Sequence, residues 1–554
     1  MKHIKARYIL YAMLLASPFT MSAQTAENDT LSNDPLVNVA YRQVAQSDIM
    51  GSVAVLDYEA LTEKNYNTYS LDNMQAYVSG FNGNSLWGMD ADNDQGYLVL
   101  IDGVPRDANN VLPTEIAQVT FLKSAQAVVL YGSRAAKGAI LITTKRATND
   151  GLSVSVRANT GVAVAKAFPE YLGAAEYMTL YNEALANDGN APLYSAEEIY
   201  NHSAGLNPYR YPDINYYSSE YINKAYNRTD VTAEISGGGK RAHFYSNVSY
   251  YNQGDFLKVG EAANNNTSRF NVRDNVDVHI NDFVKAHINA NTTFYDAKSA
   301  KGDYWNVAST MRPNFPQHAA PLIPLELIDP NALGALELIA ASANIIDGKY
   351  FLGGTQQNTT NAFADMYAAG RSKWTSRQFQ FDTGVDIDLQ KVLKGLTFKT
   401  NFAMDYATSY NTSYDNTYAI YTPTWSNYNG KEVIVGLTKE GLDEKSGNQN
   451  IGGSSANMTV LFNAMFDYNR TFAQKHNLSA LLVASGFQQT ISGTYHRTSN
   501  ANLGVQAAYN YDKRYYVDFS GALVHSAKLA PGHRKAFSPS ATLGWKIANE
   551  SFLK

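Results

Sequence analysis

The 554-residue sequence has no cysteine, which excludes disulfides, thiolate zinc sites, cysteine nucleophiles and a lipid anchor on an N-terminal cysteine. Charged residues are scarce at 17% and the formal net charge is −5, so the chain lacks the basic surface of a nucleic-acid binder. No stretch reaches the roughly 18 uninterrupted apolar residues of a transmembrane helix. A membrane-embedded product would therefore have to cross with β-strands.

Catalytic and metal-binding patterns are missing as well. The ten histidines show no HExxH spacing and no Gly-x-Ser-x-Gly elbow occurs, so we predict no enzyme activity, no metal centre and no cofactor. The segment DADND at residues 90–94 has the alternating carboxylates of a calcium loop. Gln95 stands where that loop needs glycine, however, and Ile101 where it needs glutamate, which favours a solvated loop.

The N-terminus predicts export. Lys2, Lys5 and Arg7 precede an apolar run at residues 8–16, which is too short to span a bilayer. Small residues at positions 22 and 23 then predict cleavage, so we expect residues 1–23 to be a signal peptide.

The longer part of the chain alternates with a period of two. Met458, Val460 and Phe462 fall on one face of an extended segment, while Asn457 and Thr459 fall on the other. Residues 270–281 and 502–511 repeat the pattern. Such alternation is typical of transmembrane strands, apolar toward lipid and polar toward the lumen. A soluble β-sandwich alternates too, so the pattern alone leaves both open.

Connection lengths favour the membrane interpretation. Connections after even-numbered strands are short and those after odd-numbered strands are medium or very long, which is typical of periplasmic turns and extracellular loops. This parity places everything before residue 151 on the periplasmic side or inside the barrel. We predict about twelve strands, at residues 152–164, 229–237, 242–253, 267–280, 284–297, 374–389, 394–410, 456–470, 477–492, 501–511, 515–525 and 538–548.

Residues 46–148 have a different pattern, that of a compact α/β unit. We predict strands at 52–56, 97–101, 119–123 and 139–144, with helical segments at 71–78 and from 124. Asp102-Gly103 predicts a turn after a strand, and Gly132 and Gly138 predict tight turns before the last strand. Residues 132–138 faintly resemble a phosphate loop but lack its Gly-Lys-Ser/Thr ending, so we do not predict nucleotide binding.

Four stretches make a resemblance specific: PLVNVAYRQV at 35–44, YLVLIDGVPRD at 97–107, LYGSRAAKGAILITTKRA at 130–147 and YNYDKRYYVDFSGAL at 509–523. They resemble the plug and barrel of SusC/RagA-family TonB-dependent outer-membrane transporters, and the resemblance runs from about residue 36 to the end. It implies a membrane β-barrel (antiparallel, about 12 strands present of an expected 22) with an N-terminal α/β plug domain.

The resemblance also implies domains and motif residues. We expect a leader with a candidate TonB box at 24–45, the plug domain at 46–150 and a partial barrel with long extracellular loops at 151–554. The expected plug motif comprises Asp102, Gly103, Tyr131, Gly132, Arg134, Gly138 and Lys145.

The implied function is TonB-dependent import of a bulky nutrient, an oligosaccharide or peptide, held between the barrel and a SusD-like lipoprotein. The TonB-ExbB-ExbD complex would supply energy, and the protein would lie among the outer-membrane lipid of a Gram-negative, Bacteroidetes-like bacterium. The candidate TonB box lies within Leu36–Val44 and comprises Leu36, Val37, Asn38, Val39, Ala40 and Tyr41. An ordinary flexible leader is the alternative for this segment.

Aromatic residues in the predicted long loops are candidates for stacking on a ligand, with an interfacial girdle as the alternative. These residues are Trp305, Trp374, Tyr421 and Trp425.

The sequence departs from the family in three places. We expect no N-terminal carboxypeptidase-regulatory-like domain, and LWGMDADNDQG at 86–96 replaces the usual Arg-Gly motif before the IDGVP strand. About twelve strands are also too few to enclose a plug of this size. We therefore expect a truncated gene product or one part of a barrel that a second polypeptide completes. The alternative is a truncated or remnant SusC-like surface-binding protein without transport activity.

Overall fold

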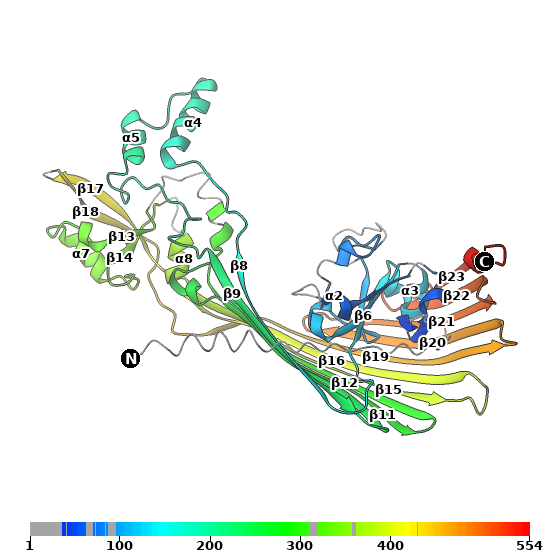
Figure 1. Ribbon diagram of the computed structural model, residues 1–554. Helices are drawn as coiled ribbons and strands as arrows, with labels where there is room; N and C mark the ends of the chain where they lie inside the picture. Colours follow the sequence, from blue (N-terminus) through cyan, green and yellow to red (C-terminus); the bar gives the residue numbers. More distant parts are fainter. Residues whose placement is uncertain are drawn as a thin grey trace, which may run out of the picture.

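The computed structural model describes residues 36–553 apart from 40, 52, 63–69, 72–73, 84, 87–95, 124, 307, 310–319, 357–361 and 429. The predicted signal peptide and residues 90–94 therefore lie outside the described residues. A five-stranded sheet near the N-terminus and a twelve-stranded sheet dominate the molecule. Figure 1 shows the small sheet lying against one face of the large sheet, at the end away from the long connections.

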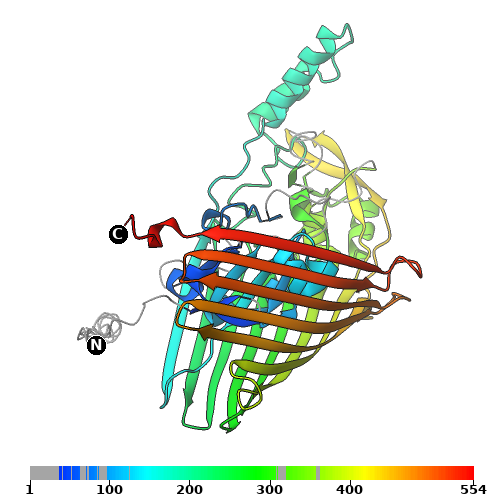
Figure 2. The ribbon, with the colours of Figure 1, turned by 90° about the vertical axis from the view of Figure 1, so that its right-hand side faces the viewer.

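The large sheet is antiparallel throughout and follows chain order without a crossover. It contains β8 (Ser153–Val164), β9 (Ala225–Gly238), β10 (Ala242–Gln253), β11 (Asn266–Asn281), β12 (Val284–Ala300), β15 (Gly370–Asp388), β16 (Leu396–Asp415), β19 (Asn450–Phe472), β20 (His476–Ile491), β21 (Thr498–Tyr511), β22 (Tyr515–Ser526) and β23 (Lys535–Trp545). All twelve predicted strands are thus confirmed. β8 and β23 are the edges of the described sheet, which curves around the small sheet without closing (Figure 2).

The two faces of the large sheet differ as the alternation predicts. On β19, Phe462 is 52% exposed, whereas the next residue, Asn463, is fully buried. Phe462 also lies opposite Phe402 of β16, so apolar side chains continue across strands on the outer face. Leu461 and Met465 are exceptions, because they are apolar but belong to the inner face, where they are buried in clusters shared with residues of the small sheet. The outer face is suited to lipid and the inner face is mostly polar.

The turns confirm the predicted parity. Residues 239–241, 282–283, 389–395, 473–475 and 512–514 make the short connections at one end. At Ala473-Gln474 and Asp512-Lys513 the chain reverses through two successive left-handed residues, with φ between 48° and 60°. Paired left-handed residues match the twist of the flanking strands, which makes these turns tight. The long connections, at 165–224, 301–369 and 416–449, all lie at the opposite end.

The five-stranded sheet and its helices form the unit that we call the plug. Its strand order is β3-β6-β7-β4-β5, with β4 and β7 parallel. In the described residues of the predicted helical segment at 71–78, the structure has a single 3-10 turn, Met74–Ala76. The bounds are β3 (Val53–Asp57), α2 (Tyr58–Thr62), β4 (Leu98–Ile101), β5 (Val104–Pro105), β6 (Ile116–Leu122), α3 (Ala125–Tyr131) and β7 (Ala139–Thr144).

Glycines make the turns that the plug motif predicts. Asp102 and Gly103 connect β4 to β5 with φ of 50° and 83°. Gly138, at φ 100°, precedes β7 directly, and a Cβ atom there would collide with the Leu86 side chain and the Leu122 carbonyl oxygen. Only glycine fits this position, because the backbone there has a positive φ and neighbouring atoms leave no room for a Cβ atom.

A hairpin precedes the plug. Its strands β1 (Leu36–Val39) and β2 (Arg42–Ala45) pair antiparallel with each other and with no other strand among the described residues. The hairpin lies between the plug and the inner face of the large sheet, near the short turns.

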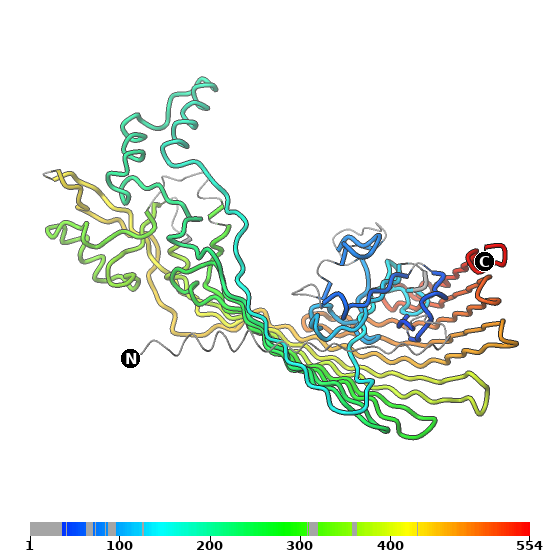
Figure 3. The backbone as a smooth tube through the Cα atoms, viewed as in Figure 1, coloured from blue at the N-terminus to red at the C-terminus, as the bar shows by residue number. Residues whose placement is uncertain are grey.

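The long connections carry structure of their own. They contain α4 (Ala174–Asn187), α5 (Ala196–Ala204), β13 (Leu322–Pro324), α7 (Leu333–Ala340), β14 (Tyr350–Leu352), α8 (Ala362–Ala368), β17 (Ile420–Tyr428) and β18 (Lys431–Glu440). Figure 3 shows these segments gathered at the end of the sheet opposite to the plug. None of the described helices is long and apolar enough to cross a membrane.

Candidate functional site: the seam between plug and wall

We call the inner face of the large sheet the wall. Arg106, which follows β5, reaches from the plug to the wall at β15 and β16. Its Nε and Nη2 donate to the two carboxylate oxygens of Asp405 at 2.8 Å each, and its Nη1 donates to Asp382 at 2.9 Å. The side chains of Arg106 and Asp382 are only 2% and 1% exposed. Burial lowers the pKa of Arg106, but hydrogen bonds to and charges of Asp405 and Asp382 outweigh it and hold that pKa above its ordinary range. The guanidinium is therefore charged and anchors the plug to the wall.

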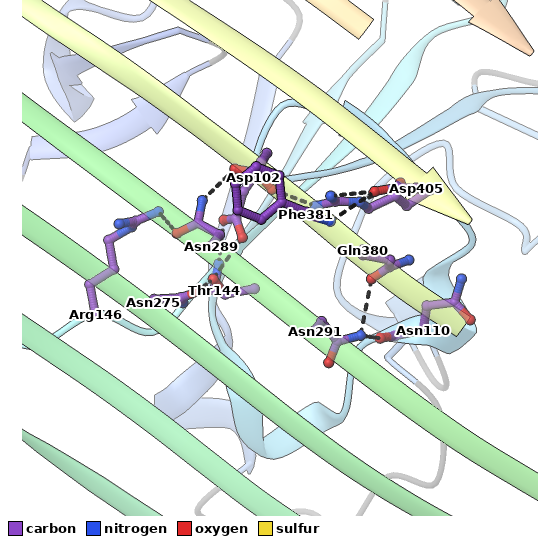
Figure 4. A network of polar contacts seen from close by, with 12 residues as sticks. Asp102, Asn110, Thr144, Arg146, Asn275, Asn289, Asn291, Gln380, Phe381 and Asp405 are labelled. Carbon is purple, nitrogen blue, oxygen red and sulfur yellow. Dashed lines mark hydrogen bonds and ion pairs between the residues drawn. The ribbon is translucent and has the colours of Figure 1, made fainter. Parts of the chain in front are cut away.

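A second anchor lies beside the first (Figure 4). The Asp102 carboxylate accepts hydrogen bonds from the Thr144 backbone N–H at 3.0 Å and hydroxyl at 2.7 Å, which ties the β4–β5 turn to the end of β7. Two residues further on, Arg146 donates to Asp277 at 2.7 Å and to Asn289 at 2.6 Å on the wall. Burial lowers the pKa of Arg146, but the charges of Asp102 and Asp277 raise it by more. The predicted turn thus positions two cations against the wall.

A third anchor has the opposite polarity. Glu115 of the plug accepts hydrogen bonds from Arg273 at 3.0 Å and Asn271 at 2.7 Å, both on β11. Glu115 and Arg273 are at most 1% exposed. A buried ion pair of this kind specifies position, since moving either partner leaves an uncompensated charge.

Apart from the Glu115–Arg273 pair, the seam between plug and wall joins basic plug residues to acidic wall residues. Lys145, a motif residue, adds to Arg106 and Arg146 by contacting Glu234 of β9 at 3.2 Å and Glu59 of α2 at 3.2 Å. Such complementarity fixes the docking register. The polar groups can be solvated again when the contacts open, and they act beside apolar clusters that plug and wall share around Met465, Leu461 and Ala522.

A polar cavity of about 820 Å³ lies between plug and wall on the side of Arg106. Arg134 lines it with its guanidinium 3.7 Å from the centre of the Phe487 ring. Nη1 of Arg134 is buried without a hydrogen-bond partner among the described residues, as are the side-chain oxygens of Gln378 and Asn457 in the same lining. Desolvation lowers the pKa of Arg134 to about 10, so it remains cationic at neutral pH. The cavity suits a polar occupant.

The candidate TonB box forms the first half of the hairpin. Asn38 donates its backbone N–H to the Gln118 side chain at 3.1 Å, and the Gln118 amide donates back to the Asn38 carbonyl at 2.7 Å. The Thr120 hydroxyl donates to the same carbonyl at 2.8 Å, so two side chains take the place of a neighbouring strand along the free edge of β1. Leu36 is 66% exposed, Val37 is buried, Val39 packs against the plug and Ala40 lies outside the described residues.

Tyr41, the last residue of the candidate TonB box, and Arg42, the first residue of β2, contact both plug and wall. Tyr41 packs against the motif residue Tyr131 with ring centres 5.3 Å apart, and burial raises the pKa of both phenols. Arg42 donates to Ser479 at 3.2 Å and Gln506 at 2.9 Å on the wall. The hairpin is therefore docked through single side-chain contacts rather than through a β-ladder.

The four aromatic candidates are dispersed. Trp305 stacks on Phe168 within a loop cluster, with ring centres 6.4 Å apart. Trp374 is 42% exposed and lies opposite Ala297, on the same face of β15 as Gln378, which favours the lumen over a lipid-facing girdle. Tyr421 is fully buried in a loop core and offers no ring to a ligand, while Trp425 is partly buried against the same core.

The sequence analysis missed Arg106 with its partners Asp382 and Asp405, and it also missed the anchors formed by Arg146, Glu115 and Arg273. Arg106 belongs to the quoted IDGVPRD stretch, and both carboxylates occupy inner-face positions of predicted strands. The sequence therefore placed each residue on the correct element but did not indicate that they contact one another. In the described part of the chain, no group of three or more His, Asp or Glu side chains is arranged to hold a metal ion. The DADND segment lies outside that part.

Comparison with known proteins agrees with this geometry. The TonB-dependent receptor plug domain model matches residues 45–139. TonB-dependent receptor P26 of Formosa agariphila is 21% identical over 551 residues, covering 94% of this chain and 51% of the relative. TonB-dependent receptor SusC of Bacteroides thetaiotaomicron is 27% identical over 308 residues, covering 50% of this chain and 28% of SusC. The chain spans about half the length of P26.

Solved structures share the fold. The RagAB peptide importer in the open-open state superposes with a TM-score of 0.67 at 16% identity, covering 94% of this chain and 59% of that one. The closed-closed state gives a TM-score of 0.66 at 17% identity, with 91% and 58% covered. At this identity the likeness concerns the fold.

Proposed function

We propose that this chain, which is a SusC/RagA-family TonB-dependent receptor of the outer membrane, serves in TonB-dependent import of a bulky nutrient. The observation that carries the proposal is the seam. A plug that must leave its wall during transport needs contacts that are specific when made and solvated when broken. Arg106, Arg146 and Glu115 provide such contacts, since each is paired with wall residues that water can also hydrate.

The hairpin is the proposed point where energy enters. On its free edge β1 is held at Asn38 by two side chains, the Gln118 amide and the Thr120 hydroxyl, so a partner strand that offered a full β-ladder would compete with them. TonB, energised by ExbB and ExbD, would bind there and pull. Force on β1 reaches the plug through Tyr41 and Tyr131, which lie next to the cavity-lining segment of Arg134.

The nutrient is an oligosaccharide or a peptide in this proposal, and a SusD-like lipoprotein is the capturing partner. The similarity to SusC and to the RagAB peptide importer supports this class of system. The folded long connections, which include α4, α5 and the β17–β18 hairpin, offer a broad platform at the end opposite to the plug. The polar cavity beside Arg134 is suited to such hydrophilic solutes.

The experiment uses Asn38→Pro, which removes the N–H on the free edge of β1, with Asn38→Ala as the matched control that keeps it. Cells lacking the endogenous gene are grown on a panel of oligosaccharides and peptides as sole nutrient, and binding of the same labelled solutes to intact cells is measured in parallel. We expect wild type and Asn38→Ala to support growth, and Asn38→Pro to retain binding but lose growth.

Three outcomes are distinguishable. Uptake by Asn38→Pro equal to wild type would place TonB binding outside β1. Growth of the wild type that persists without TonB would contradict energised import altogether. Binding without growth in every strain, wild type included, would favour the surface-binding protein without transport activity.

A further inference from the structure

The outer face of β15 defines where the lipid ends. Its outer-face side chains from Phe379 to Ile387 are apolar except for Thr383, over eight residue steps or about 26 Å along the strand. With the roughly 40° tilt of barrel strands this is about 20 Å of height, close to the apolar band of outer-membrane barrels. Phe379 and its neighbour on β12, Phe294, are 43% exposed and mark the band's upper edge, on the side of the long connections.

Basic residues begin directly above this edge. Arg377 lies opposite Phe294 in the β12–β15 register, with its guanidinium 5.4 Å from the ring centre. Lys373, four residues further, lies directly opposite Lys298. Arg371 continues the row over the Tyr414 ring at 5.0 Å. We call Lys298, Arg371, Lys373 and Arg377 the basic rim.

Among the described residues, one carboxylate forms ion pairs with any of the four cations of the basic rim. Asp296 contacts Arg377 at 3.0 Å and Lys373 at 3.3 Å. Like charges directly opposite each other on a sheet are destabilising, so the Lys298–Lys373 pair needs a counter-charge that Asp296 alone does not supply.

Neighbouring strands do not provide it. The register partners of the rim on β11 and β16 are uncharged: Asn266 lies opposite Lys298, Thr408 opposite Arg377 and Thr412 opposite Lys373. The rim side chains remain solvent-accessible, with Lys373 40% and Arg377 35% exposed. The rim therefore carries net positive charge that its described register partners do not neutralise, which leaves it able to take an anion from outside.

We propose that the basic rim binds the phosphate groups of the glycolipid in the outer leaflet of the outer membrane. The chemistry is that of lysine and arginine side chains on a phosphate, and the location commits it to a lipid source. The acyl chains of such a lipid lie along the Phe294–Phe379 surface while its phosphates stand at the height of Arg377 and Lys373. This inference depends on the outer-membrane location and is independent of the proposed import.

The test measures binding of purified lipid A to the protein extracted from outer membranes in detergent, by native mass spectrometry. The native protein is compared with a Lys298→Gln, Lys373→Gln, Arg377→Gln variant. The matched control is the Lys391→Gln, Lys394→Gln variant, because these two lysines lie in the short turn between β15 and β16, at the end of the strands opposite to the basic rim. Dephosphorylated lipid A and inorganic phosphate are the comparison ligands.

We expect the native protein and the control to prefer phosphorylated over dephosphorylated lipid A at least tenfold, and the rim variant to lose that preference. Equal binding of both lipids by the native protein would overturn the proposal even if the rim variant failed to fold. So would rim-variant binding equal to that of the native protein. Displacement of the lipid by inorganic phosphate at equal concentration would assign the rim to free anions instead.

Discussion

Removing Arg106 is expected to loosen the plug substantially. Arg106→Ala deletes three charge-assisted hydrogen bonds and leaves two carboxylates, 1% and 13% exposed, without their cation. Stranding a buried charge in this way costs about 3–5 kcal/mol. Because Asp405 retains some access to water, we expect the lower half of that range. At about 1.36 kcal/mol per factor of ten, plug opening becomes more frequent by about two to three orders of magnitude.

Hydrogen exchange of the amides in β4 and β5 measures this opening. The matched control is Arg157→Ala, which removes an exposed arginine from β8 and should change exchange by less than threefold. A second variant, Arg106→Leu with Asp382→Leu and Asp405→Leu, removes the stranded charges together with the cation. We expect it to recover most of the lost protection, because replacing a whole buried ion cluster by apolar groups is often neutral. Exchange in Arg106→Ala that matches the Arg157→Ala control would refute the anchoring role.

Three further predictions concern other contacts. Gly504→Ala places a methyl group against a backbone carbonyl oxygen of α3 and should destabilise plug docking by about 1–3 kcal/mol, measured by the same hydrogen-exchange assay. Gly486→Ala is the control, because its methyl group meets nothing within 4 Å and should leave docking unchanged. Burial lowers the pKa of His202 on α5, so the unfolded segment binds more protons than the folded one. The stability of the α4–α5 unit should therefore fall as the pH drops through about 6.5. Hydrogen exchange of the α4 and α5 amides at pH 5 and pH 7.5 measures this, and protection that does not depend on pH would contradict it. Gln118→Ala should raise exchange of the Asn38 amide about tenfold while β3 stays protected, and equal effects on both would indicate general loosening of the plug instead.

Local sequence signals were sufficient for the strands and turns. Alternation with a period of two located all twelve strands of the large sheet, because lipid and lumen impose opposite demands on successive side chains. The Asp102-Gly103 turn and the left-handed Gly138 were predictable for a similar reason, since their backbone conformations restrict the residue type. These features depend on neighbours within a few positions.

Trp374 and Tyr421 illustrate where local signals end. Both read as loop aromatics, yet Trp374 belongs to the inner face of a strand and Tyr421 to a buried loop core. Whether such a tryptophan or tyrosine lies on a strand face or in a buried loop core depends on how segments distant in the chain pack. The local sequence does not predict that packing.

The sequence by itself determined the architecture: a plug-like α/β unit, a wall of alternating strands and the side of the sheet on which each connection lies. Only the tertiary structure decided which inner-face carboxylates receive the plug. Arg106 bonds to residues 276 and 299 positions away, and several other inner-face residues are also acidic. Which of these carboxylates pairs with Arg106 depends on the curvature of the sheet and on the position of the plug within it. An ion pair forms only where two charges from separate elements come within about 4 Å.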